Sequence, residues 1–202
     1  MYPVAKRLFD VVGASLLLVG LSPLLGLVAL AIWGTDGRPV FFVQARAGRD
    51  GMPFRLIKFR TLTPGPKDPT RPADHTIQIG GVLRRWAIDE LPQLWNVLRG
   101  EMSLVGPRPV PLSHVDRYGP RERLRLRVRP GLTGWAQIQG RNALSWPERI
   151  ELDRQYVRSR TLGLDLYILG CTPGILFSGA GVTGRDGRNP PPRSTDLTSS
   201  SP

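Results

Sequence analysis

Cysteine and histidine are scarce in this chain of 202 residues. The single cysteine, Cys171, excludes an intramolecular disulfide framework. It lies in an apolar stretch, where we expect a packed or lipid-facing thiol. The two histidines, His75 and His114, cannot form a structural zinc site with one cysteine.

Acidic residues and lysine are also few. The chain has 28 cationic side chains against 16 acidic ones, a formal net charge of +12, and only 3 of the 28 are lysine. A surplus of this size indicates a polyanionic partner, such as nucleic acid, an anionic membrane surface or a phosphorylated substrate. Arginine grips phosphate in a bidentate way, so its dominance suits that partner. A genome-wide codon bias would give the same dominance.

Charge is absent from residues 11–33. As one helix this run would measure about 35 Å, enough to cross a hydrocarbon core of about 30 Å. It is too long for a signal peptide, and no small-residue cleavage site follows it. Ser22 and Pro23 lie at its centre, where proline bends a helix and a serine hydroxyl can bond a freed carbonyl. The sequence therefore leaves two alternatives: a straight anchor, or a re-entrant helix over residues 1–36 with both flanks on one membrane face.

The remaining sequence predicts an α/β fold that is mostly helical, with a catalytic domain over residues 37–182. A β-hairpin is expected over residues 38–61, with Leu56, Lys58 and Arg60 on one strand face. Helices are expected over residues 89–99, 117–128 and 146–160, the second with a basic face. The apolar residues 162–182 contain a Thr-Pro-Gly break, which favours a pair of interfacial amphipathic helices. We expect a Pro-rich loop over residues 63–74 and a disordered tail over residues 183–202.

Asp89 and Glu90 are the sharpest candidate for chemistry. Adjacent side chains on a helix point about 100° apart, so the two carboxylates can act on neighbouring points. The alternative is structural, with Asp89 as an N-cap ahead of Pro92. Carboxylates among cations suit Mg²⁺ with a diphosphate. The candidate phosphate-binding cations are Arg84 and Arg85 just before the pair, Arg108 between two prolines, and Lys58 and Arg60 on the hairpin. Further along, Gly131 and Gly134 would permit close approach of the backbone to a ligand.

Several long motifs occur in an order that resembles the bacterial sugar transferase family, the monotopic phosphoglycosyl transferases. The matching segments lie between about residues 3 and 170: KRLFDVVGA, Ser22-Pro23, VFFVQARAGRDGMPFRLIKFRTL, IDELPQLWNVLRGEMSLVGPRP, VRPGLTGWAQIQGRNALSW and LDLYIL.

The resemblance implies transfer of a sugar-1-phosphate from a UDP-sugar to polyprenyl phosphate, usually undecaprenyl phosphate, with release of UMP. This would be the first membrane step of glycoconjugate synthesis, at the cytoplasmic face of the bacterial inner membrane and in contact with its lipids. The resemblance assigns Asp89 as nucleophile and Mg²⁺ ligand, and Glu90 as an aid to acid/base steps or metal binding. It also implies phosphate contacts at Lys58, Arg84 and Arg108, an aspartate near the active site at Asp165, and a re-entrant helix bent at Ser22-Pro23.

Two alternatives from other classes remain at this point: a non-catalytic membrane scaffold of the same fold, and a membrane-tethered nucleic-acid-binding module. If the chain is an enzyme, we expect it to have no nucleic-acid partner. A homodimer is one arrangement that the sequence leaves open.

Overall fold

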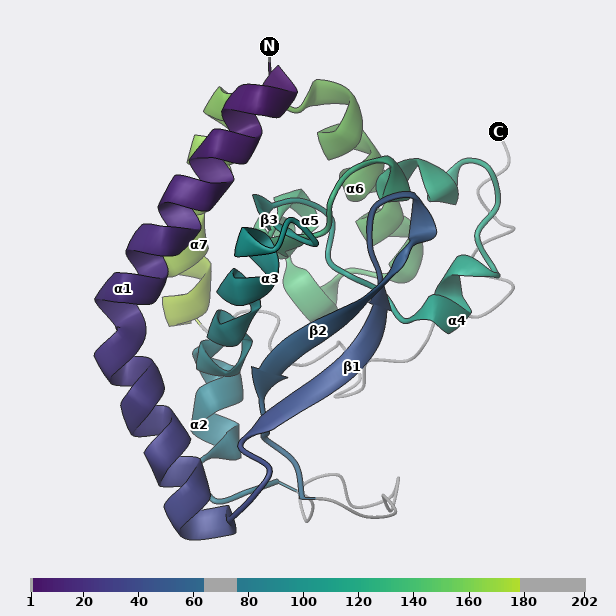
Figure 1. Cartoon of the computed structure of the whole chain (residues 1–202). Coiled ribbons are helices and arrows are strands. Elements are labelled where there is room, and N and C mark those ends of the chain that lie inside the picture. The colour runs from purple at the N-terminus through teal and green to yellow at the C-terminus, as the bar shows by residue number, and fades with distance from the viewer. Residues whose placement is uncertain (1, 64–75, 179–202) are drawn as a thin grey trace.

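The computed structural model of the chain describes residues 2–63 and 76–178 (Figure 1). Most of the expected loop over residues 63–74, His75, and the expected tail over residues 183–202 lie outside the described residues.

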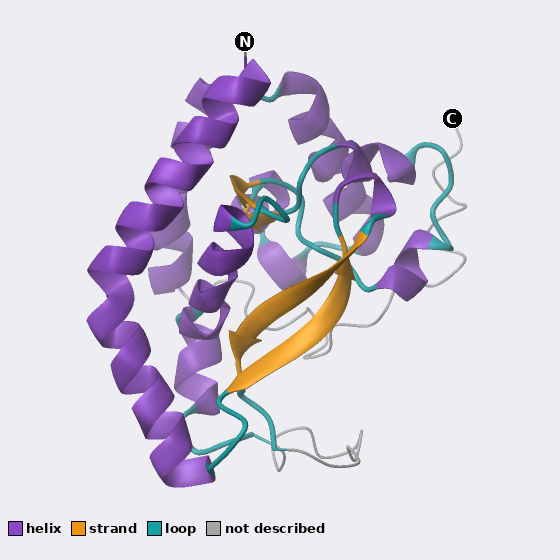
Figure 2. Ribbon diagram, in the orientation of Figure 1, coloured by secondary structure: helices purple, strands orange, loops and turns teal. Residues whose placement is uncertain are grey.

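In the described residues helices dominate, and strands occur only in a hairpin and a second, very short sheet (Figure 2). The expected mostly helical architecture with a small hairpin is confirmed. In chain order the elements are α1 (Tyr2–Asp36), β1 (Phe41–Ala47), η1 (Arg49–Gly51), β2 (Pro53–Phe59), α2 (Gly80–Arg85), η3 (Ile88–Gln93), α3 (Leu94–Leu98), β3 (Ser103–Val105), α4 (Leu112–Val115), η4 (Glu122–Arg127), β4 (Gly131–Thr133), α5 (Trp135–Gln139), η5 (Arg141–Ala143), α6 (Trp146–Ser159) and α7 (Leu162–Ser178).

Helix α1 is continuous over 35 residues and bends about half-way along its length (Figure 1). Pro23 lies inside it. Proline has no N–H to give to the carbonyl four residues earlier, which here belongs to Val19. The Ser22 hydroxyl donates to that carbonyl oxygen at 2.8 Å. The Ser-Pro pair thus satisfies the carbonyl that it frees, as the sequence predicted.

The two faces of α1 differ sharply. Its buried side chains recur every four residues in each half and form one stripe: Lys6, Asp10, Ala14, Val28 and Ile32. Large apolar side chains cover the other face and are 61–74% exposed at Leu8, Leu16, Val19, Leu27 and Leu30. The helix is long and apolar enough to cross a membrane by length and composition, with a mean hydropathy of 2.4 over its best 18 residues. An exposed apolar face of this extent favours contact with lipid.

The predicted hairpin is confirmed. Strands β1 and β2 pair antiparallel, with Gln44 opposite Leu56 and Arg46 opposite Phe54. The helix α3 is fastened to β2 by Asn96, which is fully buried. The Asn96 side chain accepts from the Ile57 N–H at 3.2 Å and donates to the Arg55 carbonyl at 2.8 Å.

Three buried apolar clusters form the core, and α1 contributes to two of them. Ala14 packs in the cluster that joins α3, β3, α6 and α7, with Leu94, Val97 and Ile168 among its members. In the other half of the helix, Val28 and Ile32 pack against β2 and α2 through a second set: Phe59, Ile77 and Leu83. Both halves of α1 are therefore held on the same folded body.

The expected basic helix over residues 117–128 is wrong. The structure has only the 3-10 helix η4, over Glu122–Arg127. Arg125 turns inward, where its Nη2 lies 2.6 Å from the Asp153 carboxylate and both side chains are buried. The solvated basic face is lost because one of its arginines is neutralised inside the protein.

The expected pair of helices over residues 162–182 is also wrong within the described residues, because α7 is a single helix that runs through Pro173. The Thr172 hydroxyl lies 2.7 Å from the Ile168 carbonyl, one turn back, and bonds Thr133 of β4 at 2.9 Å. These contacts anchor the helix at the position where the sequence suggested a break.

Gly131 and Gly134 allow close approach of the chain to itself rather than to a ligand. Strand β4 pairs parallel with β3, with Ser103 opposite Gly131. A Cβ atom on Gly131 would lie 2.1 Å from the Gly106 nitrogen, and one on Gly134 would lie 2.2 Å from the Gly106 oxygen. The expectation of ligand contact is corrected accordingly. The two glycines fix the path of the chain into the Gly-Pro-Arg-Pro segment that follows β3.

Candidate active site

Asp89 and Glu90 lie in η3, at its junction with the preceding α2. The helix begins after Ala87, which has a left-handed φ of 54° and occupies the N-cap position. A left-handed backbone is strained for alanine and marks a position held by its surroundings. The capping role considered for Asp89 is wrong, because Asp89 is inside the helix and 4% exposed.

Glu90 is clamped by Arg108. The guanidinium makes two parallel hydrogen bonds, Nη2 to Oε1 at 2.5 Å and Nη1 to Oε2 at 3.2 Å. The backbone of Arg108 is itself fixed, since its carbonyl accepts from Arg125 at 3.0 Å and Arg125 is paired with Asp153. Because 52% of the Arg108 side chain is exposed, the bound guanidinium still presents part of its surface to a ligand.

The environment of Asp89 disfavours its charge. Burial is the largest influence and, together with the negative charge of Glu90, raises the pKa of Asp89 to about 6, against opposition from Lys58 and Arg108. Perturbed carboxyl pKa values of this kind concentrate at functional sites.

Glu90 behaves oppositely, although it is the neighbour of Asp89 in the chain. Burial acts to raise its pKa, but the charge and hydrogen bonds of Arg108, helped by Lys58 and Arg141, hold the pKa of Glu90 below its ordinary value. Burial also lowers the pKa of Lys58, while the two carboxylates oppose that change. Two adjacent carboxylates with opposite pKa shifts are suited to different tasks.

A cavity of about 410 Å³ lies on the side of Arg108, the arginine that clamps Glu90. Its walls include Arg108, which holds Glu90, and Arg46 and Arg141, whose charges act on Glu90. Arg141 has a left-handed φ of 51°, a second strained position at the site. The volume falls in the range of about 300–1,000 Å³ that is usual for small-molecule sites.

Comparison with known proteins identifies what this geometry belongs to. The family described as bacterial sugar transferase matches residues 1–179. The chain belongs to the bacterial sugar transferase family. It is 43% identical over 172 residues to the uncharacterized sugar transferase EpsL of Bacillus subtilis, covering 84% of this chain and 85% of EpsL.

Two further relatives carry more informative names. The exopolysaccharide production protein ExoY of Rhizobium meliloti is 40% identical over 196 residues, covering 86% of each chain. The UDP-glucose:undecaprenyl-phosphate glucose-1-phosphate transferase of Caulobacter vibrioides is 43% identical over 185 residues, covering 85% of this chain and 69% of the relative. The chain is therefore an enzyme, a transferase.

Not every cation predicted for this transferase site is directed to it. Lys58 and Arg108 lie beside the carboxylates, as their effect on both pKa values requires. Arg60 is buried elsewhere and donates to the backbone carbonyls that end α1, to Asp36 at 2.7 Å and to Gly37 at 3.0 Å. Arg84 donates to the Thr76 hydroxyl at an exposed position.

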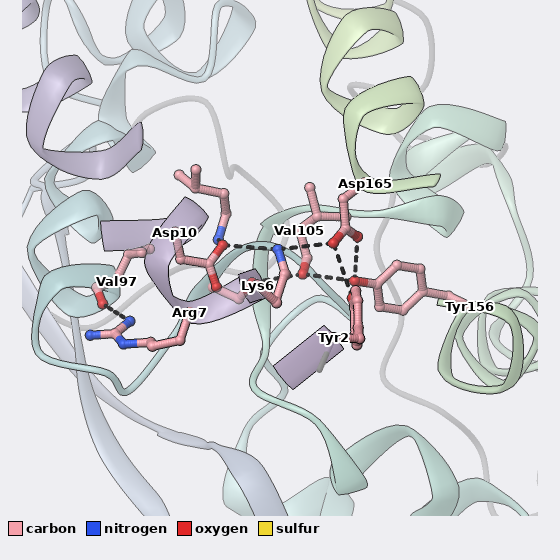
Figure 3. A network of polar contacts seen from close by, with 10 residues as sticks. Tyr2, Lys6, Arg7, Asp10, Val97, Val105, Tyr156 and Asp165 are labelled. Atoms are coloured by element: carbon pink, nitrogen blue, oxygen red, sulfur yellow. Dashed lines mark hydrogen bonds and ion pairs between the residues drawn. The ribbon is translucent and has the colours of Figure 1, made fainter. Parts of the chain in front are cut away.

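Asp165 belongs to a separate buried network that fastens α1 to α6 and α7 (Figure 3). The Tyr156 and Tyr2 hydroxyls donate to its two oxygens at 2.7 and 3.0 Å. Lys6 lies 3.3 Å from Asp165 and 2.9 Å from Asp10. With both oxygens occupied, Asp165 ties helices together in this structure, whereas the resemblance implied a role beside the active site.

Arg46 and Arg141 were missed by the sequence reasoning. The signal for Arg46 was available in the hairpin register, because alternate residues of β1 share a face with Lys58 of β2. Arg141 stands in the segment QGRNALSW, which carries part of the family resemblance, but its proximity to Glu90 depends on a fold contact that spacing does not reveal.

The carboxylate pair offers oxygen ligands for a metal ion. In the described part of the chain no group of three or more His, Cys, Asp or Glu side chains could hold a metal ion. Mg²⁺ needs fewer protein ligands than that, since it commonly takes one or two carboxylates with phosphate oxygens and water. Glu90 is engaged by Arg108, so Asp89 is the carboxylate left to bind a cation. The donor set fits Mg²⁺ held jointly by Asp89 and a phosphorylated substrate.

Proposed function

We propose that the chain transfers a sugar-1-phosphate from a UDP-sugar to polyprenyl phosphate, with release of UMP, at the cytoplasmic face of the bacterial inner membrane. The observation that carries this proposal is Asp89: a buried carboxylate with a raised pKa, beside a glutamate clamped by arginine. The names of the relatives support the reaction class. The product would begin a polysaccharide or another glycoconjugate.

The chemistry divides into two displacements. In the first, a carboxylate oxygen of Asp89 bonds to the phosphorus that carries the sugar, and the bridging P–O bond breaks, so that UMP leaves with the electron pair. In the second, a phosphate oxygen of the polyprenyl phosphate bonds to that phosphorus and the Asp89 carboxylate leaves. Covalent catalysis replaces one difficult displacement by two easier ones. It also lets a soluble donor and a lipid acceptor react in turn.

The other contribution to catalysis is the alignment and charge neutralisation of the phosphates. Phosphoryl transfer depends chiefly on alignment and charge neutralisation. Arg108, fixed through Glu90 and through its own backbone, is preorganised to neutralise the phosphate charge. The lowered pKa of Glu90 keeps it ionised at neutral pH, which suits holding Arg108 rather than donating a proton. Mg²⁺ on Asp89 would polarise the phosphoryl oxygens.

We also propose that α1 is re-entrant. Both ends of the helix are tied to one folded body: near the start by Lys6 to Asp165, and at the end by Arg60 to the last carbonyls. If the helix crossed the bilayer, its two ends would lie on opposite faces of the membrane, and one of these contacts with the folded body could not form. Cysteine labelling of intact cells in a Cys171→Ser background tests this. With Val4→Cys and Arg38→Cys variants, we expect neither cysteine to react with an impermeant reagent from the periplasm. Labelling of either one would overturn the topology.

The reaction itself is tested by screening UDP-sugars with undecaprenyl phosphate and Mg²⁺ for UMP release. We expect turnover with at least one sugar, and a lipid product with a new diphosphate bridge. A folded protein that releases UMP from no UDP-sugar would favour the scaffold alternative. Salt-dependent binding of DNA or RNA without turnover would favour the nucleic-acid-binding module.

A further inference from the structure

The cavity beside Glu90 collects polar atoms that have no partner. In the described residues, seven buried side-chain nitrogen or oxygen atoms make no hydrogen bond, and five of these seven belong to walls of this cavity. They are Arg46 Nε, His114 Nδ1, Gln137 Nε2, Gln137 Oε1 and Arg141 Nη1. Native interiors leave few such atoms unsatisfied, and a concentration of them at one cavity points to a missing polar ligand.

The walls of the cavity combine cationic and aromatic side chains. Among its walls are Arg108 and Arg141, whose charges act on the Glu90 carboxylate. Two aromatic rings also line it: His114 and Trp146 meet edge to face with centroids 5.3 Å apart, and the Arg149 guanidinium lies 5.4 Å from the centroid of the Trp146 ring. A cavity with both cationic and aromatic walls suits a ligand that carries a phosphate and a flat ring.

We infer that this cavity binds the nucleoside monophosphate half of the donor, the part that leaves as UMP. The inference rests on the proposed function, because the order of the donor follows from the chemistry. Asp89 attacks the phosphorus next to the sugar, so the second phosphate, the ribose and the base extend away from the carboxylates. The cations near Glu90 take the phosphate, and Trp146 with His114 forms the wall for the base.

Gln137 is the residue that reads the base in this arrangement. Its side-chain amide offers one donor group and one acceptor, and both are without partners. Uracil presents an N–H flanked by carbonyl oxygens, so a single amide can pair with it through two hydrogen bonds. The amide lies on α5, which is held close to Gly106 by the glycine of the preceding turn. The position of Gln137 is therefore set by the contact with Gly106, which lies two residues before Arg108 in the chain.

The inference is tested by measuring UMP binding to the purified full chain in lipid nanodiscs, without any sugar or acceptor lipid. We expect Trp146→Leu to weaken UMP binding about tenfold or more, since stacking of a base on an aromatic side chain contributes on that scale. We expect a loss of about the same size for Gln137→Ala, because two hydrogen bonds to uracil are lost. Trp146→Phe retains a ring and should recover most of the affinity. The matched controls are Gln139→Ala, two residues along α5 and exposed, and Trp95→Leu, exposed on α3. Both should bind UMP as the unmodified chain does.

Inorganic pyrophosphate separates a lost base contact from a damaged fold. It has no base to contact Gln137 or Trp146, so its binding should be unchanged in Gln137→Ala and Trp146→Leu. UMP affinity that is unchanged in these two variants, or equally weakened in the controls, would overturn the inference. So would an unmodified chain that binds pyrophosphate but not UMP. Turnover of UDP-sugars by the same preparation reports on the proposed function separately, since the reaction can proceed with the nucleotide bound elsewhere.

Discussion

Replacing Asp89 by asparagine should make the protein more stable while removing its activity. Folding raises the pKa of Asp89 from 3.8 to about 6, so the folded state disfavours the charged carboxylate relative to the unfolded chain. At about 1.36 kcal/mol for each pKa unit, the ionised side chain destabilises the fold by about 3 kcal/mol above pH 6. The penalty fades as the pH falls through 6 and is absent below 3.8, where both states bind the proton. Asparagine has nearly the same shape and carries no charge, so it should recover this stability at neutral pH.

Thermal unfolding at several pH values measures the effect. For a chain of this size, about 3 kcal/mol corresponds to a rise in Tm of about 6–12 °C at pH 7.5. The advantage of Asp89→Asn should shrink towards zero at pH 4. Asp50→Asn is the matched control, because that carboxylate is exposed and its partner Arg49 is exposed as well. An Asp89→Asn protein that is less stable than the unmodified chain, or whose advantage does not vary with pH, would refute the electrostatic account of the site.

Three further predictions follow from the same geometry. Arg108→Ala should lower kcat/KM by about 10²–10³, because a preorganised charge contact to the reacting phosphate is lost. Arg121→Ala, at an exposed position, should change kcat/KM less than about fivefold. Equal losses of kcat/KM in the two variants, at matched folding, would contradict the role given to Arg108. Plotted against pH, kcat/KM for the UDP-sugar should decrease towards acidic pH with a midpoint near pH 6, since only ionised Asp89 attacks. This decrease near pH 6 should be absent if another group is the nucleophile. Gly131→Ala should lower the free energy of unfolding by about 1–3 kcal/mol, because the new Cβ would lie 2.1 Å from a backbone atom. Gly26→Ala should not destabilise the protein, because no atom lies within 4 Å of its Cβ position. Chemical denaturation measures both free energies of unfolding.

Local patterns in the sequence were sufficient for part of this fold. Alternation and an Arg-Asp-Gly turn predict the hairpin, which forms with the expected strands. The bend at Pro23, including the role of the Ser22 hydroxyl, follows from the chemistry of one missing N–H. Asp89 and Glu90 stood out as a candidate site because the two carboxylates are adjacent in the chain.

Long-range contacts explain the partners that the sequence did not reveal. Arg60 appeared available for phosphate because nothing local shows that the end of α1 returns to it, 22–24 residues away in the chain. Arg125 was placed on a solvated face because its partner, Asp153, is 28 residues further on. Asp165 was placed near the active site, but its partners come from α1 and α6. In each case a charge was assigned to solvent or substrate when a distant group in the fold satisfies it.

The covalent role of Asp89 is tested most directly by the first half-reaction alone. The full chain is incubated with a UDP-sugar that it turns over and Mg²⁺, with no polyprenyl phosphate, and then examined by intact-mass spectrometry and peptide mapping. The account predicts release of at most about one UMP per chain before slow hydrolysis, and one sugar-phosphate adduct that maps to Asp89 and is absent from Asp89→Asn. An enzyme that turns over normally but forms no adduct, or forms it on another residue, would contradict the account.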